Sequence, residues 1–456
     1  MPPYLLRTLL ASVEAFRPAL TRPGYANALV VFVGWVLSHG RHAITEALVA
    51  TDVARRRHHE RFHRFFSRGA WSPDAIGKLL FDRLLRWVPA GGAIHMALDD
   101  TLTPKKGPHV FGLGSHLDAV RSTKRFKVFT FGHVWVVLSV TVRFPFSRRP
   151  WALPVLFRLY RNKKECARKR HPYRKKTELA RELVELAAQW AGGRGLHVAA
   201  DAAYCNATLM RGLSSAVTVF GAIRPDAVLT APPRVPRVPK AGRRRLRGDV
   251  VPKPATLAQS AQRPWQTCKA DLYGKHRRVH YKTIDAQWYR GSGPRLVRVV
   301  VVRVDDGAIK LRVFVCTDPT IAVVTILETY AERWSLEVTF RDLKQQLGFA
   351  DSSARKREAV ERTAPFVGYI YTTLILWFAD TASSSPVAAP PIRPWYRHKR
   401  GFSFADILRT AQRVLATLDV LDPARSVANL QKSDAAHVSH ADRRRAAAFA
   451  AQRQAA

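Results

Sequence analysis

The sequence contains little cysteine, and its cysteines are widely spaced. There are four in 456 residues, and none belongs to a Cys-x-x-Cys pair. This spacing argues against a zinc ribbon and against a disulfide framework. We therefore expect reduced, partly buried thiols, as in a cytosolic protein. The cysteines are Cys166, Cys205, Cys268 and Cys316.

Acidic residues are also scarce. The chain has 34 Asp and Glu against 75 Lys and Arg, which gives a formal net charge of +41. So many positive charges repel one another unless a polyanion neutralises them. A membrane surface attracts basic segments too, but here the charge runs along the whole chain and not beside one hydrophobic anchor. Nucleic acid is therefore the expected partner.

Export and membrane signals are missing from the sequence. The segment Met1–Arg7 has only a short apolar run and does not resemble an export signal. The most apolar stretch, Ala364–Ala379, contains Pro365 and is shorter than the roughly 20 residues that cross a bilayer. We expect a buried core helix there, no membrane partner and a cytoplasmic location.

The middle of the chain shows the pattern of a mixed α/β sheet with flanking helices. Strands are predicted at Ala93–Leu98 and Leu196–Ala200, and the apolar run Val128–Phe144 is predicted to form two more. Between them, Thr177–Trp190 has the periodicity of an amphipathic helix that ends at two glycines. This order of elements predicts a sheet that is covered by helices.

Composition changes along the chain suggest the limits of its domains. The N-terminal part is helical and carries arginines interleaved with aromatic residues between Ile44 and Arg68, a pattern that can grip phosphates or be only a solvated basic face. No DNA-recognition motif is clear enough to name. The predicted divisions are 1–90, helical and DNA-binding; 91–230, the first part of the catalytic core; 231–318, a basic loop and a β-rich insertion; 319–380, the catalytic helix and the rest of the core; and 381–456, a linker, a C-terminal helix and a basic tail.

One predicted helix, Tyr330–Phe349, carries an unusual row of polar residues. At about 100° per residue the row falls within an arc of roughly 60° at the rim of the apolar face. Glu337 is flanked there by cations, so a metal-binding oxygen can lie beside groups that hold phosphates. An ordinary helix with ion pairs worth a few tenths of a kcal/mol remains an alternative. The row consists of Tyr330, Arg333, Glu337 and Lys344, with Arg341 close beside it.

The row Tyr330-x2-Arg333-x3-Glu337-x6-Lys344 resembles the Tyr-Arg-Glu-Lys signature of DDE-type transposases from bacterial insertion sequences. The resemblance implies a ribonuclease-H-like core with a β-rich insertion before the last catalytic helix. It also implies two aspartates that follow strands, and Asp100 and Asp201 stand at such places. We choose Asp100 because the family's first aspartate commonly precedes a threonine. Asp99 would point to the other face of the strand, so only one of the two can be a ligand, and Asp99 remains the alternative.

The resemblance further implies cleavage and strand transfer of DNA at a two-metal site. Asp100 would bridge two Mg²⁺ ions, with Asp201 and Glu337 each completing one, and Mn²⁺ would substitute. Tyr330, Arg333, Lys344 and Arg341 would contact phosphates, while Trp334 would either stack on a base or simply pack. The implied partners are transposon inverted repeats and target DNA, bound by a synaptic homodimer in a bacterial nucleoid.

Three other functions share parts of this pattern. A catalytically inactive or domesticated DNA-binding protein accounts for the charge but not for the three carboxylates. A two-metal nuclease without strand transfer would use the same site. A basic RNA-binding or structural protein is disfavoured because the sequence contains no recognised RNA-binding module.

Overall fold

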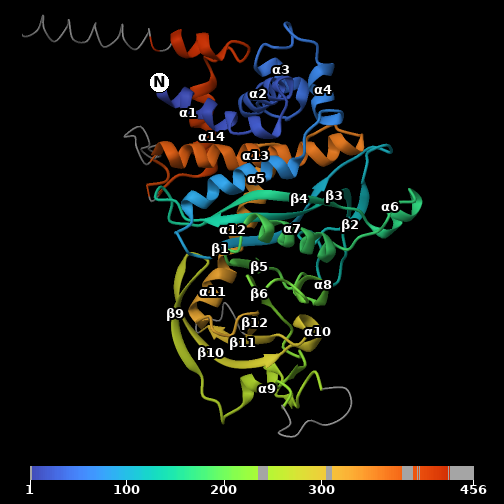
Figure 1. Cartoon of the computed structure of the whole chain (residues 1–456), viewed down its shortest axis with the longest axis vertical. Helices are drawn as coiled ribbons and strands as arrows, with labels where there is room; N and C mark the ends of the chain where they lie inside the picture. The colour runs from blue at the N-terminus through green and yellow to red at the C-terminus, as the bar shows by residue number, and fades with distance from the viewer. Residues whose placement is uncertain are drawn as a thin grey trace, which may run out of the picture. The chain divides into compact units, whose positions relative to one another are not determined.

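The computed structural model describes residues 3–234, 245–304, 311–382, 394–397, 399, 401–429 and 431. Two compact units are formed by segments that are not contiguous in the chain. The first unit comprises Met1–Leu79, Pro145–Ser147 and Asp342–Ala456, and the second comprises Leu80–Phe144 and Arg148–Arg341. Figure 1 labels their helices and strands.

The first unit consists of helices. The amphipathic helix α4 buries its aromatic residues Phe62, Phe65 and Phe66 and leaves Arg61 and Arg64 exposed, as the arginine–aromatic pattern predicted. Its helices are α1 (Pro3–Glu14), α2 (Arg22–Leu37), α3 (Ile44–Ala50), α4 (Glu60–Ser67), most of α5 (Pro73–Leu84), α13 (Arg357–Ala382) and α14 (Phe404–Leu415), with the short 3-10 helix η1 (Arg17–Ala19). Among the described residues, no helix has the length and apolar character needed to cross a membrane.

Helices α2 and α3 approach each other closely at Gly34. A Cβ atom built on Gly34 would lie 2.1 Å from the backbone oxygen of Ala47. Real Cβ atoms do not come so near to a carbonyl oxygen, so one helix would have to move. Glycine is otherwise unfavourable inside a helix by about 1 kcal/mol relative to alanine. Close helix packing therefore explains why α2 contains a glycine.

Helix α14 begins with a buried carboxylate. The Asp406 side chain is only 3% exposed, and it accepts hydrogen bonds from the Ser403 backbone N–H at 2.9 Å and the Ser403 hydroxyl at 2.6 Å. Lys399 forms an ion pair with the same carboxylate. Burial opposes the charge, but the contacts with Lys399 and Ser403 outweigh it and lower the pKa of Asp406 to about 2. The ionised carboxylate thus stabilises the start of α14.

The second unit is built on a large mixed sheet. Strands β1, β5 and β6 are parallel neighbours, while β3 is antiparallel to β1 and β4 is antiparallel to β3. The predicted fold class, a mixed α/β sheet with flanking helices and a β-rich insertion, is confirmed. Its strands are β1 (Ile94–Pro104), β2 (Gly114–Leu117), β3 (Phe129–Val142), β4 (Trp151–Tyr160), β5 (Leu196–Ala200), β6 (Val217–Ala222), β7 (Leu229–Thr230), β8 (Val250–Val251), β9 (Gln266–Leu272), β10 (Lys275–Gln287), β11 (Leu296–Val304) and β12 (Arg312–Cys316).

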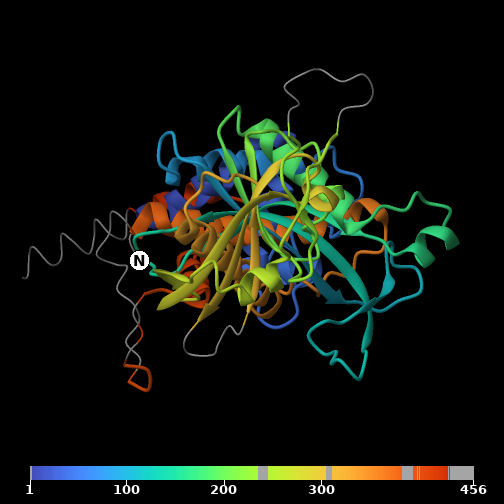
Figure 2. The same ribbon diagram turned by 90° about the horizontal axis from the view of Figure 1, so that it is seen from below.

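Helices accompany this sheet along the second unit. Helix α7 contacts β3 and β4, and helix α11 contacts β5 and β6. The helices are α6 (Lys163–Arg168), α7 (Lys176–Trp190), α8 (Ala207–Met210), α9 (Pro254–Gln259), α10 (Tyr289–Ser292), α11 (Val323–Glu332) and most of α12 (Trp334–Gln346), with the 3-10 helix η2 (Leu85–Trp87). Figure 2 shows the yellow strands of the insertion fanned by the twist of the sheet.

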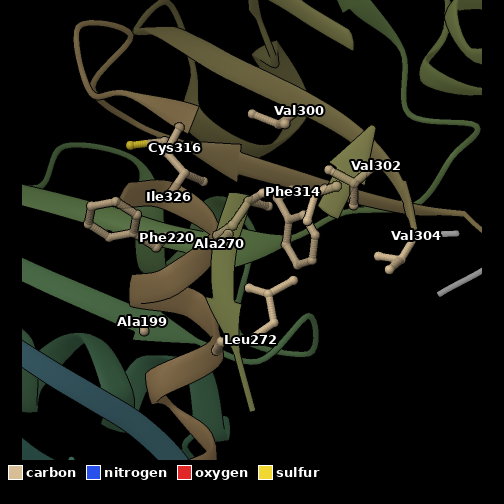
Figure 3. Packing of buried hydrophobic residues seen from close by; sticks show 13 residues of the cluster. Ala199, Phe220, Ala270, Leu272, Val300, Val302, Val304, Phe314, Cys316 and Ile326 are labelled. Carbon is tan, nitrogen blue, oxygen red and sulfur yellow. The ribbon is translucent and has the colours of Figure 1, made fainter. Parts of the chain in front are cut away.

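The insertion and helix α11 share a hydrophobic core with the parallel strands. Phe220 of β6, Phe314 of β12 and Ile326 of α11 are all buried in this cluster (Figure 3). Tyr330, near the end of α11, packs on Phe314 with 4.8 Å between ring centroids. This packing fixes the end of α11 against the sheet, and with it the residues that follow.

Three local predictions differ from the structure. The run Val128–Phe144 forms one strand, β3, and not two, because it pairs with β1 along most of its length. Strand β1 continues beyond Leu98 to Pro104 for the same reason. The expected single helix from Tyr330 is interrupted at Arg333, which separates α11 from α12.

Other local predictions are confirmed as far as the described residues reach. Strand β5 has the predicted limits, and α7 and α14 lie where helices were expected. The sequence Asp305–Gly307 between two β-rich runs predicts a hairpin, and strands β11 and β12 on either side of it pair antiparallel. The proposed turn at Asp305–Gly307, most of the basic loop between Pro232 and Pro254, and the C-terminal tail lie outside the described residues.

The substitution Gly34→Ala is expected to destabilise the first unit by at least about 2 kcal/mol, because the added methyl group overpacks the contact between α2 and α3. Urea unfolding followed by circular dichroism measures the loss. Gly195→Ala is the matched control, since its Cβ would meet its nearest neighbour at 3.7 Å, an ordinary contact. Equal stability of the two variants would contradict the close approach.

The substitution Asp406→Asn is expected to cost about 2 kcal/mol of unfolding free energy at neutral pH. The folded pKa of Asp406 is lowered to about 2, so its contribution is present above pH 4 and is lost as the pH falls towards 2. The difference in stability between wild type and Asp406→Asn should therefore shrink over that range. A difference that stayed constant from pH 6 to pH 2 would refute this role.

Candidate active site

The two faces of β1 carry different polar groups. Successive strand residues point to opposite faces, so the neighbours Asp99 and Asp100 are directed apart. Parallel pairing of β1 with β5 ends at Leu98 and Ala200, which places the next residues side by side, with Asp99 within β1 and Asp201 directly after β5. Ala199, two residues before Asp201, belongs to the cluster that includes α11. Asp99 and Asp201 therefore share the face of the sheet that α11 covers.

Three carboxylates on that face surround one guanidinium. Arg333 follows α11 and is only 9% exposed. It forms an ion pair with Asp99, donates a hydrogen bond of 3.2 Å to Glu337, and lies 4.0 Å from a carboxylate oxygen of Asp201. The one-residue break between α11 and α12 puts Arg333 at the end of one helix and Glu337 in the first turn of the next. Residues that are 234 positions apart in the chain, Asp99 and Arg333, thus meet directly.

The carboxylates of this cluster are short of positive charge. Burial, together with the neighbouring Asp100 and Asp201, raises the pKa of Asp99 to about 7, although Arg333 opposes the shift. Burial also raises the pKa of Glu337, again against the effect of Arg333 and with a contribution from Asp201. One guanidinium cannot neutralise three carboxylates, so the cluster would be stabilised by further cations.

Asp100 has different partners on the opposite face. Its carboxylate forms an ion pair of 2.7 Å with Lys176, the first residue of α7, and accepts a hydrogen bond of 2.6 Å from the Tyr204 hydroxyl. Tyr204 is 2% exposed, and its backbone N–H donates to the carbonyl of Asp201 at 2.9 Å. Burial and the adjacent Asp100 carboxylate raise the pKa of Tyr204, which keeps its hydroxyl protonated as a donor. Asp100 thus ties the turn that contains Asp201 to β1.

The expected trio of Asp100, Asp201 and Glu337 is therefore only partly brought together. Asp201 and Glu337 lie at the same guanidinium, whereas Asp100 faces Lys176 and Tyr204. Asp99, the alternative at the first position, occupies the place beside them.

The remaining residues of the signature lie around the cluster or further along α12. Tyr330 is half-buried, with its ring 5.6 Å from the Arg333 guanidinium carbon, and burial raises its pKa to about 12. Trp334 is 52% exposed, and its ring meets that of Tyr273 edge-on at 6.0 Å. Arg341 and Lys344 are exposed on α12, one and two turns beyond Glu337.

The donor set suits a hard divalent cation, although the side chains do not enclose one as they stand. Carboxylate oxygens are the ligands that Mg²⁺ prefers. Within the part of the chain that the structure describes, no three His, Cys, Asp or Glu side chains are grouped closely enough to hold a metal ion. Arg333 lies between the three carboxylates and contacts the oxygens that a cation would need. The carboxylates therefore fit a metal chemically, but the Arg333 side chain would have to move away from their oxygens to admit it.

Sequence reasoning missed Lys176, Tyr204 and Tyr273, and it named Asp99 only as the alternative to Asp100. The spacing between Asp201 and Tyr204 was visible, but its significance depends on a contact with Asp100, 104 positions away. The choice between Asp99 and Asp100 depends on which of them shares a face of the sheet with Asp201 and α11. That follows from the register of β1 with β5, which the sequence does not reveal.

The substitution Tyr204→Phe is expected to cost about 2 kcal/mol of stability, because it removes the hydrogen bond from a buried hydroxyl to a partly buried carboxylate. Tyr273→Phe is the control, since Tyr273 is 50% exposed and should cost little. Thermal unfolding of the two variants makes the comparison. If Tyr204→Phe were as stable as Tyr273→Phe, the tie between Asp100 and the Asp201 turn would be unimportant.

Comparison with known proteins gives the family. A solved structure titled as a cryo-EM structure of the piggyBac transposase synaptic complex with hairpin DNA is similar at 11% identity and a TM-score of 0.39, covering 90% of this chain and 76% of that chain. No curated protein matches the chain. The family model described as DDE superfamily endonuclease matches residues 15–294, more than half of the chain, including Asp99, Asp100 and Asp201. The chain belongs to the DDE superfamily endonuclease family.

Proposed function

We propose that the chain is a transposase of the bacterial insertion-sequence type, which binds the ends of a DNA element, cleaves them and joins them to target DNA. One observation carries the proposal: an aspartate within β1, an aspartate directly after the neighbouring parallel strand β5 and a glutamate on α12 surround one buried guanidinium. Membership of the endonuclease family supports the reaction class. The spacing of Tyr330, Arg333, Glu337 and Lys344 supports the insertion-sequence branch.

Asp99, Asp201 and Glu337 are the proposed metal ligands. Asp99 takes the place first given to Asp100, because it shares a face of the sheet with Asp201 and a guanidinium with Glu337. DDE-superfamily nucleases typically use divalent metals. Two Mg²⁺ ions, or Mn²⁺ in their place, would supply an activated water and neutralise the leaving oxygen.

The chain's own residues would hold the DNA beside this site. Arg333 presents donors in a planar fork that suits a phosphate as well as a carboxylate. Tyr330 adds a hydroxyl that burial keeps protonated, and the exposed Arg341 and Lys344 add positive charge along α12. The exposed pair Trp334 and Tyr273 offers ring surface to a displaced base. The arginine face of α4 remains our prediction for a further DNA contact within residues 1–90.

The proposed substrates are double-stranded transposon ends with inverted repeats, together with target DNA, bound by a homodimer in the synaptic complex. The net charge of +41 supports a polyanionic partner. A nuclease that cleaves without rejoining would use the same carboxylates, and a catalytically inactive protein would only bind. Precut transposon ends, incubated with target plasmid, separate these functions because only a transposase joins them.

Asp99→Asn, Asp201→Asn and Glu337→Gln are each expected to lower Mg²⁺-dependent cleavage at least 1,000-fold, an order-of-magnitude expectation for losing a metal ligand. DNA binding should persist, because each change removes negative charge from a site that must accept phosphates. The substrate is a labelled duplex that carries the inverted repeat found beside the gene, incubated with and without EDTA.

Asp100→Asn is the matched comparison for Asp99→Asn. We expect it to keep substantial cleavage, with a loss of stability because its partners Lys176 and Tyr204 remain. Full cleavage by Asp99→Asn, together with none by a folded Asp100→Asn, would return Asp100 to the ligand set. Metal-dependent cleavage by Glu337→Gln at the wild-type rate would reject the site altogether.

A further inference from the structure

The hairpin formed by β2 and β3 exposes an apolar face. Leu117 and Phe129 are direct partners across the two strands, and Phe131 is two residues further along β3, so all three point to the same face. They are 48%, 65% and 63% exposed, and Phe126 in the connection is 69% exposed. The opposite face is different, because His116 is buried there. Figure 2 shows the teal segment that contains β2 and this connection extending outward from the sheet.

The connection between the strands is held in one conformation. The Asp118 carboxylate accepts hydrogen bonds of 3.1 Å from the backbone N–H groups of Val120 and Arg121. Further along, the hydroxyls of Ser122 and Thr123 accept from the N–H groups of Val128 and Phe126, each at 3.0 Å. An ordered connection loses less conformational entropy on binding than a flexible one.

Positive charge surrounds these rings. Four basic side chains of the connection are exposed, and Asp118 is the single acidic residue between Gly114 and Phe131. The exposed basic residues are Arg121, Lys124, Arg125 and Lys127.

Rings and cations together indicate the class of partner. Covering these exposed rings by a binding partner would be favourable, because burying each ring would gain about 2 kcal/mol. A second copy of the chain would bring two clusters of four cations together, which is electrostatically unfavourable. Duplex DNA supplies phosphates for the cations and base surfaces for the rings, and apolar wedges that enter between base steps are a known way of binding it.

We propose that the β2–β3 hairpin is a second DNA-binding surface, at which Phe126, Phe129 and Phe131 insert against base steps while the four basic residues hold the flanking phosphates. The inference rests on the proposal that the chain acts on DNA. It adds a contact outside the carboxylate cluster, on a surface that the Tyr-Arg-Glu-Lys signature does not include.

The test is binding of the full chain to a 30-bp random-sequence duplex by fluorescence anisotropy, without divalent metal so that no cleavage occurs. The variant Phe126→Ser/Phe129→Ser/Phe131→Ser should bind at least tenfold more weakly, with an unchanged dependence on salt. Wild type should also prefer a duplex that contains a mismatch, since unstacking costs less there, and the triple variant should lose this preference. The control Val228→Ser/Val250→Ser also removes exposed apolar side chains, 41% and 70% exposed, and should bind as wild type does.

A second variant, with Arg121, Lys124, Arg125 and Lys127 all changed to Gln, keeps the rings and removes the charge. The slope of log affinity against log salt concentration should become shallower by up to about 3.6, roughly 0.9 for each lost phosphate contact. Wild-type affinity and an unchanged mismatch preference in the triple Phe variant would overturn the proposal. So would a change from dimer to monomer in sedimentation with DNA affinity intact, because the hairpin would then be a protein interface. If the wild-type protein bound no DNA, the proposed function itself would be wrong. If wild type bound and cleaved DNA and the hairpin variants behaved as wild type does, only the proposal for the hairpin would be wrong.

Discussion

The arrangement of the candidate site depends on the buried guanidinium of Arg333. It contacts Asp99 from β1 and Glu337 from α12, and it lies 4.0 Å from Asp201. Removing the guanidinium would leave Asp99, 18% exposed, without its ion-pair partner, whereas Asp201 and Glu337, 42% and 36% exposed, are partly screened by solvent. The charge on Arg333 therefore holds these carboxylates together. It also contacts the carboxylate oxygens of Asp99 and Glu337 that the proposed metal ions would use, so Arg333 and a metal would compete for them.

The adjacent aspartates of β1 illustrate how a strand divides two tasks between its faces. Asp99 belongs to the carboxylate cluster, while Asp100 holds Lys176 at the start of α7 and the hydroxyl of Tyr204. Tyr204 in turn closes the turn that begins at Asp201. A carboxylate on the far face thus restrains the backbone that carries a carboxylate on the near face. The two aspartates are coupled although their side chains point apart.

Much of the second unit follows from local sequence pattern, whereas the pairing at the site does not. The limits of β5 and the helix α7 were predicted because alternation and helical periodicity are visible within a few residues. The length of β1 and the single strand β3 depend on their pairing with each other, which no local pattern encodes. The break at Arg333 could not be predicted from local sequence either. No proline or glycine stands at this position, and the Arg333 backbone remains near helical angles. Asp201 and Glu337 could be found from a motif, but the choice between Asp99 and Asp100 required the register of β1 with β5.

The distribution of charge gives the site its chemical character. The chain as a whole is strongly basic, yet three of its 34 acidic residues converge where burial raises the pKa values of Asp99 and Glu337. A basic surface draws in a polyanion over a long range, while a local excess of carboxylate repels the same phosphates at short range. The two effects oppose each other unless cations enter with the substrate or before it. Clustered carboxylates in a basic chain therefore support the proposed metal site, since positive surface charge alone would bind DNA more tightly without them.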